Sequence, residues 1–416
     1  MIMVNKERFS GAAGSAIKWC LFAVLFAAPF SKSISELSIA LAIILWLIKK
    51  TADRDFRLAK TELNISLLVF VLAVVPSLFI SAFPLLSIKA FFTKVLKFVL
   101  LYFVIVENID TRSKLKDLCI VGFLSAVIIL IDGLIQHGFV VTDPLHNYPL
   151  FKLRSEWDEN GFFRGFPTAS FPFPNDLSAW ILLVLFPIAC LAMFDLKRRK
   201  VRHLAGLVSL GLFYLFFLAK ARAAWIGLAI STVYIALSKK KVWLIGLLIL
   251  LVAVPFILKM EMAGYIFGAS SMGDRASMWN TGAQIFKAHP IIGNGLNTFF
   301  VKFREYRNDK FKGLKGSYAH NCYLQMAADT GLIGLVSFLW LILSYFISII
   351  KGIRGMDDGF HKSLVWGISI GVFAFLVQSF FDTNLYSLNL ATLFWFAIGL
   401  SQSILKVSSI GTPCHD

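Results

Sequence analysis

The sequence contains few charged residues. They make up only 16% of its 416 residues, and 24 acidic residues stand against 41 lysines and arginines. By contrast, 58% of the residues are hydrophobic and 41 are phenylalanine. A chain this apolar, with a mean hydropathy of +0.75, cannot bury its hydrophobic residues in one water-soluble core, so we expect an integral membrane protein.

Patterns that bind metals or nucleotides are also missing. The 5 cysteines fall mostly in apolar stretches, so we expect no structural disulfide. None of the 7 histidines pairs with another at the four-residue spacing of a helical zinc site, and the adjacent Asp158 and Glu159 are typical of a solvated loop. No phosphate loop or nucleotide-binding pattern occurs, so we expect no metal, no other cofactor and no ATP dependence.

Long apolar runs dominate the chain instead. Each can cross about 30 Å of hydrocarbon, and few carry a charge near the middle. We expect about twelve spans, at residues 17–31, 34–48, 63–81, 89–107, 117–135, 176–195, 204–219, 223–238, 242–258, 323–350, 363–381 and 388–405. The predicted fold class is an all-α polytopic membrane protein of about twelve transmembrane helices.

Lysine and arginine gather in alternate loops, which is typical of loops that stay in the cytoplasm. These clusters lie at the N-terminus and in residues 49–60, 112–116, 197–202, 239–241 and 351–362. Both termini are then cytoplasmic, and two long loops lie on the opposite side. The N-terminus has no clear cleavage site, so we expect it to remain in the mature chain.

This alternation divides the chain into three parts. Residues 1–258 hold nine spans and a first long loop at about 136–175, residues 259–322 form a second long loop, and residues 323–416 hold three spans and a short cytoplasmic tail. The second loop is longer than a simple connector needs to be. We therefore expect it to be a small helical unit outside the membrane.

The second long loop is basic, although it lies on the side where lysine and arginine are normally scarce. Its basic residues are Lys259, Arg275, Lys287, Lys302, Arg304, Arg307, Lys310, Lys312 and Lys315, against the acidic Glu261, Asp274, Glu305 and Asp309. Such a surface attracts phosphate-bearing membrane lipids or polyanionic glycolipids. Nucleic acid is a poor fit on this side of a membrane.

Two helices are predicted in the second long loop. Asp274 has the residue type of an N-cap, and Pro290 marks the end of the helix that follows. The apolar stripe of this helix comprises Met278, Trp279, Gly282, Ile285 and Phe286. We expect the helix to lie on the membrane or against the bundle. A second helix starts at about residue 298, after a tight turn in the IIGNGLN segment.

Three basic residues lie where an anion could bind. Arg275 falls in the first turn of the first loop helix, where a cation opposes the helix dipole unless an anion such as a pyrophosphate is present. Lys220 and Arg222 occupy a short turn between two spans, among alanines that let a ligand approach. The alternatives are a contact of Arg275 with Asp274 or water, and snorkelling of the other two toward the interface.

His320 lies just before the tenth span, beside Asn321 and Tyr323. With an unperturbed pKa of about 6.5, a histidine is the one local residue type suited to accept a proton near neutral pH. A lone histidine is otherwise more often a hydrogen-bonded surface residue.

Four segments of the chain resemble the O-antigen ligase and polymerase superfamily. They are RGFPTASFPFPND in the first long loop, AKARAAW between the seventh and eighth spans, GDRASMWNTGAQIFKAHPIIGNGLNTF in the second long loop and YAHNCYLQMAADTGLIGL leading into the tenth span. Each segment alone is a loose match. Their order, spacing and common side of the membrane make the resemblance specific.

The resemblance implies a GT-C-like helical glycosyltransferase in the inner membrane of a Gram-negative bacterium, with its active site facing the periplasm. The implied donor is a glycan on undecaprenyl pyrophosphate, and the implied acceptor of a ligase is a sugar hydroxyl of the lipid A core. Inversion at the anomeric carbon without a metal is implied as well.

The resemblance also assigns functions to individual residues. Arg222 and Arg275 would engage the donor pyrophosphate, and His320 would activate or orient the acceptor. Arg164, in the first-loop motif, would make a supporting donor contact or shape the loop. Lys220 stands where the family often has a small polar residue, so it would strengthen the anion site or snorkel.

Three further residues are expected to contribute to substrate binding. They are Asn321, next to the histidine, and Arg304 and Arg307, in the basic second loop.

Three alternatives remain open from the sequence. A polymerase would use the same donor with a second lipid-linked glycan as acceptor. A protein-glycosylating relative typically has more chain after the last span. A transporter of polyprenyl-linked glycans would show an internal repeat and charges at mid-membrane, whereas Asp132 and Asp382 lie near span ends.

Overall fold

The computed structural model of the chain describes residues 2–142, 167–194, 199–238, 269–307, 317–356 and 359–410, and no strand occurs in these residues. Their helices are α1 (Ile2–Ala27), α2 (Lys32–Asp53), α3 (Asn64–Phe79), α4 (Pro84–Ala90), the π-helix η1 (Phe91–Leu96), α5 (Lys97–Asn108), α6 (Arg112–Thr142), α7 (Pro174–Phe194), α8 (Arg199–Ala219), α9 (Arg222–Ser238), α11 (Ala269–Ala288), α12 (Phe299–Tyr306), α13 (Cys322–Arg354), α14 (Gly359–Gln378), the 3-10 helix η3 (Asn384–Tyr386) and α15 (Leu388–Ile410).

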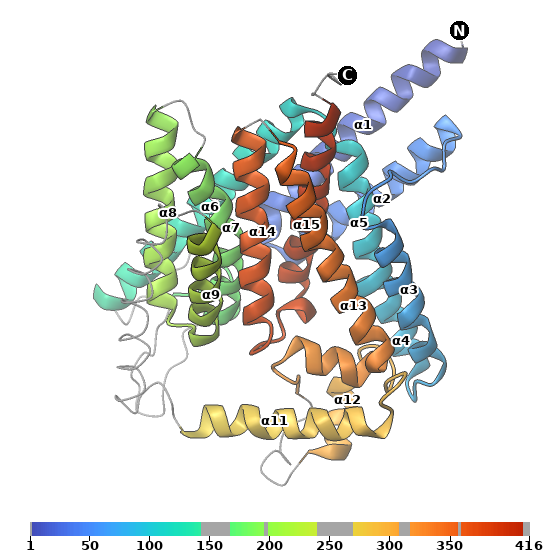
Figure 1. Cartoon of the computed structure of the whole chain (residues 1–416), viewed down its shortest axis with the longest axis vertical. Coiled ribbons are helices and arrows are strands. Elements are labelled where there is room, and N and C mark those ends of the chain that lie inside the picture. Colours follow the sequence, from blue (N-terminus) through green and yellow to red (C-terminus); the bar gives the residue numbers. More distant parts are fainter. Residues whose placement is uncertain are drawn as a thin grey trace.

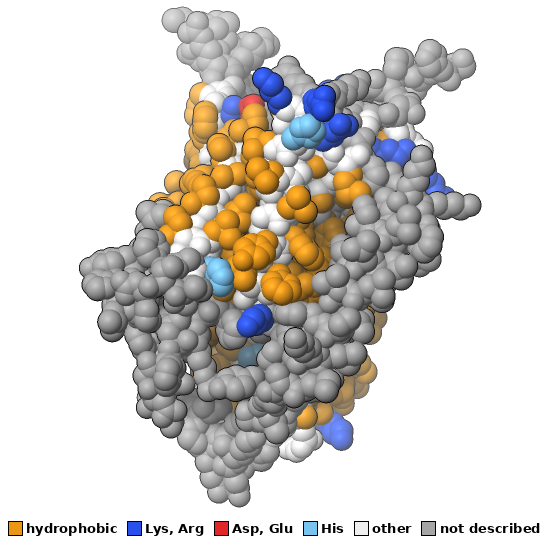
Figure 2. Space-filling model, turned by 90° about the vertical axis from the view of Figure 1, so that its left-hand side faces the viewer, with side chains coloured by type: hydrophobic (Ala, Val, Ile, Leu, Met, Phe, Trp, Pro, Cys, Tyr) orange, Lys and Arg blue, Asp and Glu red, His pale blue; other side chains and the backbone are white. Residues whose placement is uncertain are grey.

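The helices confirm the predicted class of an all-α polytopic membrane protein. Seven of those described are long and apolar enough to cross a bilayer, namely α1, α6, α7, α8, α13, α14 and α15, and α3 and α9 are shorter apolar helices. Figure 2 shows hydrophobic side chains over the middle of one face and lysine and arginine side chains gathered at its upper end. The predicted span 242–258 lies outside the described residues, so the number of twelve stays a prediction.

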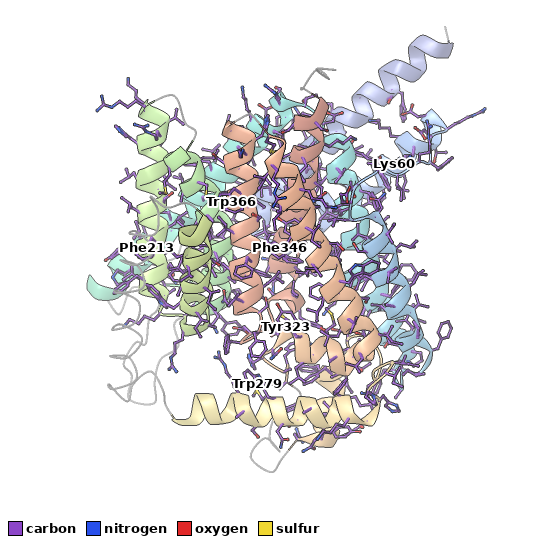
Figure 3. The ribbon with its side chains drawn as sticks, in the orientation of Figure 1. Lys60, Phe213, Trp279, Tyr323, Phe346 and Trp366 are labelled. Atoms are coloured by element: carbon purple, nitrogen blue, oxygen red, sulfur yellow. The ribbon has the colours of Figure 1, made fainter. Side chains whose placement is uncertain are left out.

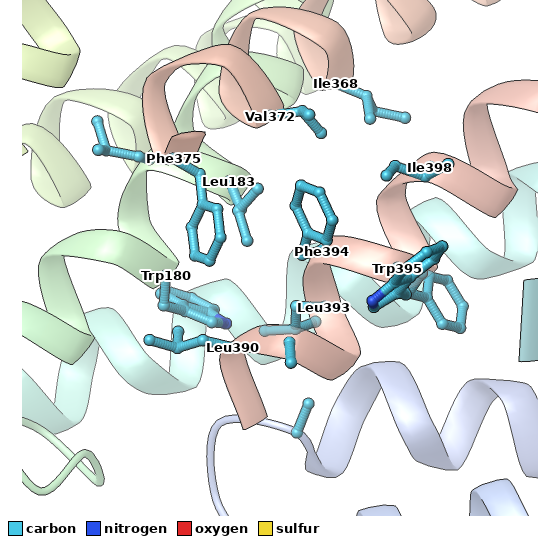
Figure 4. Packing of buried hydrophobic residues seen from close by; sticks show 14 of the residues in the cluster. Trp180, Leu183, Ile368, Val372, Phe375, Leu390, Leu393, Phe394, Trp395 and Ile398 are labelled. Atoms are coloured by element: carbon cyan, nitrogen blue, oxygen red, sulfur yellow. The ribbon is translucent and has the colours of Figure 1, made fainter. Parts of the chain in front are cut away.

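The long helices form one bundle, with the ends of the chain at one end and α11 lying across the other (Figure 1). The core lies where α7, α14 and α15 meet, around Trp180, Phe375 and Phe394 (Figure 4). The rings of Phe375 and Phe394 stack with their centroids 5.6 Å apart. Glycine allows α7 and α14 to approach closely, because a Cβ added at Gly367 of α14 would lie 2.6 Å from the Cα of Pro187 in α7.

A second, smaller core belongs to residues 269–307, which we call the α11–α12 unit. Ile285, Phe299 and Phe303 are fully buried in it and pack with Ala328 of α13. The two loop helices predicted from the sequence are therefore both present, and the first lies against the bundle. The tight turn between them is confirmed by the positive φ angles of Gly293 and Gly295, 84° and 114°.

One predicted helix boundary was wrong. Helix α11 begins at Ala269, so Asp274 lies inside the helix and Arg275 lies beyond its first turn. The free N–H groups of the helix end thus belong to residues before Arg275, and they do not assist this arginine. Helix α6 continues to Thr142, and the predicted membrane span 117–135 lies within its apolar part, Arg112–His137.

Helix α13 changes direction at Gly331, whose φ is 68° and ψ is −172°. Its first nine residues lie across the end of the bundle, and the remainder runs through the bundle (Figure 1). A Cβ on Gly331 would lie 2.2 Å from the carbonyl oxygen of Ile291, so the kink and the turn after α11 require each other. The kink positions the residues that precede α13 against the end of α14.

A half-buried lysine connects the α11–α12 unit to the bundle. Lys94, in the π-helix η1, donates a hydrogen bond of 2.7 Å to Oδ1 of Asn297. Next to it, the fully buried Asp329 accepts a 2.9 Å bond from the backbone N–H of Phe299, at the start of α12. Residues far apart in the chain thus fix the unit at one place on the bundle.

Candidate active site

The site is built where residues 320–323 meet the loop that follows α14. The backbone N–H of Cys322 donates a 2.9 Å hydrogen bond to the carbonyl of Ser379, and its Sγ lies 3.2 Å from the carbonyl oxygen of Asp382. The hydroxyl of Tyr323 donates to the carbonyl of Leu376 at 2.8 Å. These bonds hold the start of α13 against the end of α14, and His320 lies two residues before the first of them.

His320 itself has a left-handed backbone, with φ at 49°. Histidine is among the residue types that adopt this region more readily, and strained residues are often found at functional sites. The next residue, Asn321, is the N-cap of α13, because its Oδ1 accepts from the N–H groups of Tyr323 and Leu324 at 3.0 and 2.9 Å. The backbone therefore turns sharply at His320 and enters the helix directly afterwards.

His320 faces a buried carboxylate. Its Nδ1 lies 3.5 Å from Oδ1 of Asp382, and the side chains are 38% and 13% exposed, respectively. Nδ1 is buried, so the exposed part of the imidazole is elsewhere on the ring. A separation of 3.5 Å is long for a direct hydrogen bond, so we describe the contact between the imidazole and the carboxylate as electrostatic. The ring is thus oriented with one nitrogen inward.

Two hydrogen bonds hold the carboxylate of Asp382 in place. Its Oδ1 accepts a 2.8 Å hydrogen bond from the N–H of Thr383, and its Oδ2 accepts one of 2.8 Å from Nδ2 of Asn175 at the start of α7. The amide of Gln378 in turn donates to the carbonyl of Asn175 at 3.1 Å. Asn175 therefore positions the carboxylate.

The surroundings of Asp382 keep it ionised. Burial acts to raise the pKa of this carboxyl, but His320, the N–H of Thr383 and the charge of Arg275 outweigh it and hold the pKa below the usual value. A carboxylate beside Nδ1 favours the tautomer with its proton on that nitrogen, and Nε2 is then free to accept a proton. Such a pair can take a proton from a hydroxyl group.

Arg275 reaches the site through α11. Four residues further along this helix, Trp279 donates from Nε1 to the carbonyl oxygen of His320 at 3.4 Å. The Trp279 ring also packs on Phe380 and Phe381, with centroid distances of 5.7 and 6.3 Å. Trp279 and Tyr323 are both at this end of the bundle in Figure 3. Residues i and i+4 share a helix face, so Arg275 and Trp279 point the same way, in agreement with the charge effect on Asp382.

Arg222 lies at the same end of the bundle, at the start of α9. A Cβ added at Gly227 would lie 2.6 Å from the carbonyl oxygen of Ala374, so α9 and α14 touch closely there. The two helices are antiparallel, and Arg222 precedes Gly227 while Asp382 follows Ala374. Both residues therefore lie on the same side of this contact, with Arg222 half-buried.

The other predicted site residues have varied positions. Lys220 is exposed just before α9 and has a left-handed backbone, with φ at 51°. Arg304 is exposed on α12, and Arg307 directly follows that helix. Arg164 lies outside the described residues. The side-chain oxygen of Asn321 is engaged in capping α13, and a binding role for any of these five residues stays a prediction.

Sequence reasoning missed Asp382 and Asn175 as parts of the site. The available signal was an aspartate directly after an apolar span, on the same side as the histidine. We considered it only as a possible sign of transport. Its partner is 62 positions away in the chain, and a single sequence carries no direct information about that pairing.

The fold and the site together define a class of protein: a polytopic helical membrane protein with arginine, histidine and carboxylate side chains at one end of its bundle. Residues 206–339 match the family model described as O-antigen ligase. This segment contains Arg222, Arg275 and His320, and the match confirms the resemblance indicated by the sequence motifs.

Curated proteins show the same relationship. The chain is 23% identical over 343 residues to a candidate polysaccharide ligase of Rickettsia conorii, covering 78% of this chain and 74% of the relative. A candidate polysaccharide ligase of Rickettsia felis is 22% identical over 310 residues, covering 71% and 67%. The exopolysaccharide production protein ExoQ of Rhizobium meliloti is 23% identical over 121 residues, covering 28% and 27%.

Proposed function

We propose that this protein is an O-antigen ligase, a glycosyltransferase that moves a glycan from undecaprenyl pyrophosphate to a sugar hydroxyl of the lipid A core. The reaction would take place at the periplasmic face of the inner membrane. The observation that supports this most is the contact between His320 and Asp382, beside a helix that carries Arg275. The family match and the polysaccharide ligases among the relatives support the same class.

In this proposal, Nε2 of His320 accepts the proton of the acceptor hydroxyl. The hydroxyl oxygen then bonds to the anomeric carbon, and the bond from that carbon to the pyrophosphate oxygen breaks. Attack from the face opposite to the leaving group inverts the anomeric configuration. Undecaprenyl pyrophosphate leaves with the bonding electrons, and the ionised Asp382 stabilises the imidazolium that forms.

Arg222 and Arg275 would hold the pyrophosphate. Negative charge grows on this group as the sugar bond breaks, so fixed guanidinium groups stabilise the transition state more than the bound substrate. A guanidinium can contact two phosphate oxygens at once, which a lysine ammonium cannot do in the same geometry. Because these cations supply the stabilisation, the proposal requires no metal ion.

The test is reconstitution of the purified full chain with undecaprenyl-pyrophosphate glycan and lipid A core, in the presence of a chelator. We expect glycan transfer to the core with an inverted anomeric bond, assigned by NMR spectroscopy. The His320→Gln variant should lose transfer, while His289→Gln, which changes an exposed histidine after α11, should retain it. No transfer by the wild-type protein to any glycan acceptor would refute the proposal.

A polymerase is the second candidate, because ExoQ, a protein named for exopolysaccharide production, is among the relatives. It would use the same donor and the same His320 chemistry, with a second lipid-linked glycan as acceptor. The same reconstitution separates the two, since a polymerase would lengthen the lipid-linked glycan without lipid A core. Movement of the donor across the bilayer without a new bond would instead indicate a transporter.

A further inference from the structure

A polar cavity lies at the end of the bundle opposite to His320. It has a volume of about 560 Å³ and opens between α13, α15 and the loop that connects α2 to α3. Three lysines line it, Lys60, Lys351 and Lys406, together with one acidic residue, Glu62. We call this space the lysine cavity. Figure 3 shows Lys60 far from Trp279 and Tyr323, at the other end of the helices.

The loop that carries Lys60 is held in place on both sides of this residue. On one side, the N–H of Ala59 donates a 2.9 Å hydrogen bond to Oε1 of Glu107 in α5. On the other, the hydroxyl groups of Thr61 and Tyr102 lie 2.7 Å apart. The backbone of Lys60 is thereby fixed at the edge of the cavity, and its amine is presented from a defined position.

Buried polar side chains lie at the base of the lysine cavity. Gln402 of α15 donates from Nε2 to the hydroxyl of Ser348 in α13 at 2.6 Å, and both residues are less than 5% exposed. The helices can approach this closely because position 352 is glycine, where a Cβ would lie 2.4 Å from Cδ2 of Leu405. A polar base in an otherwise apolar bundle suits a hydrated headgroup better than a hydrocarbon chain.

An exposed apolar stripe leads along α13 to the cavity. Leu339, Leu343 and Ile347 are 44%, 58% and 42% exposed, and they follow one another at four-residue spacing. The next position in this row is Lys351, at the cavity. Residues four apart form one ridge of a helix, so an acyl chain lying along this ridge would bring its headgroup to Lys351.

We propose that the lysine cavity binds the phosphate headgroup of an anionic phospholipid, with an acyl chain along the stripe of α13. Three lysines face one glutamate, which lies 3.9 Å from Nζ of Lys351, so the lining keeps an excess of positive charge. Basic pockets between helices are suited to phosphatidylglycerol-like or cardiolipin-like headgroups. The stripe favours a lipid over a free phosphate ion. The proposal is independent of the reaction at His320.

The experiment measures lipid binding by the purified full chain. Delipidated protein is titrated with phosphatidylglycerol and with phosphatidylcholine in a neutral detergent, and lipid adducts are quantified by native mass spectrometry. Inorganic phosphate is added in a separate competition. We expect preferential binding of phosphatidylglycerol, and phosphate should compete only weakly.

Two triple variants test the location of the site. The first variant changes all three lysines of the cavity to glutamine, namely Lys60, Lys351 and Lys406. It should weaken binding of phosphatidylglycerol by on the order of 100-fold, at about fivefold for each lysine. The control variant changes three lysines at the same end of the bundle but outside the cavity lining to glutamine, namely Lys49, Lys116 and Lys200. It should alter the affinity for phosphatidylglycerol by less than about threefold. Equal losses in both variants would mean that the attraction is diffuse and overturn the proposal.

The Glu62→Gln variant adds a test in the opposite direction. It removes the one acidic residue of the lining and should strengthen phosphatidylglycerol binding, by about fivefold. This variant keeps the proposal testable if the triple variant does not fold. Unchanged binding in Glu62→Gln, equal binding of phosphatidylcholine, or displacement of the lipid by millimolar phosphate would each contradict a phospholipid site.

Discussion

The two ends of the bundle carry positive charge in different ways. At the His320 end, charged and polar groups are buried or half-buried and connected: Asp382 contacts His320, Thr383 and Asn175, and Lys94 is bonded to Asn297. At the other end, Lys60 and Lys351 are exposed around a cavity with one acidic neighbour. Buried, oriented charge is what bond breaking requires, whereas exposed charge suits the attraction of a headgroup.

The comparison predicts the largest effect for His320 itself. Replacing it by alanine removes the proposed base, so transfer should fall by about 10²- to 10⁴-fold. The rate of glycan transfer in proteoliposomes measures this, with His289→Ala as the matched control. If His320→Ala keeps more than a tenth of the activity, His320 is not the base, and the His320 end of the bundle is not the catalytic end that we propose.

The next largest loss of transfer activity is expected from changes to Arg222 and Arg275. Arg275→Lys and Arg222→Lys keep the charge but lose the planar fork, and loss of one such donor typically costs about 10²- to 10³-fold in rate. The same transfer assay in proteoliposomes measures this loss, and Lys287→Gln, which changes an exposed residue of α11, should have no effect. Full activity in both lysine variants would show that a point charge suffices.

A smaller effect is expected for Asp382→Asn. The variant preserves shape and leaves the base in place but removes the charge that orients and stabilises the imidazole, so it should cost only part of the roughly 10²- to 10⁴-fold that a general base contributes. The maximal rate of transfer should fall by a larger factor than the factor by which the KM for the acceptor changes. A fall in thermal stability without a change in rate would instead assign Asp382 a purely structural role.

The pH dependence of stability offers a separate measurement on Asp382. Its pKa is lowered in the folded protein, so its contribution to stability is complete above the unfolded value of about 3.9 and is lost as pH falls through the folded value. The melting temperatures of wild type and Asp382→Asn should therefore differ at pH 6 and converge below about pH 4. A difference that persists at low pH would contradict this account.

The last prediction concerns the stability of the folded protein, which we expect Lys94→Met to lower. It removes the hydrogen bond to Asn297 and leaves buried polar groups with fewer partners, so the folded protein should lose about 1–3 kcal/mol. The melting temperature in detergent measures this. Lys89→Met, which changes an exposed lysine one turn earlier, is the control. An equal effect of both variants would mean that Lys94 does not hold the α11–α12 unit in place.

Much of the fold follows from local patterns in the sequence. The predicted spans 176–195 and 204–219 correspond to α7 and α8, because each apolar run must satisfy its backbone hydrogen bonds within one helix. The start of α11 was missed, since a residue suited to an N-cap can also lie inside a helix. The π-helix at Lys94 was missed as well, because no local pattern distinguishes it from an α-helix.

Apolar runs, charge distribution and four short motifs were sufficient to predict a helical membrane protein with Arg222, Arg275 and His320 at the same end of its bundle. Local sequence has this power because the bilayer restricts each segment to a helix of known length and depth. Only the tertiary structure placed Asp382 against His320 and Lys94 against Asn297, 62 and 203 positions apart. Such contacts depend on how whole helices pack, and helix packing is decided by side chains from many segments at once.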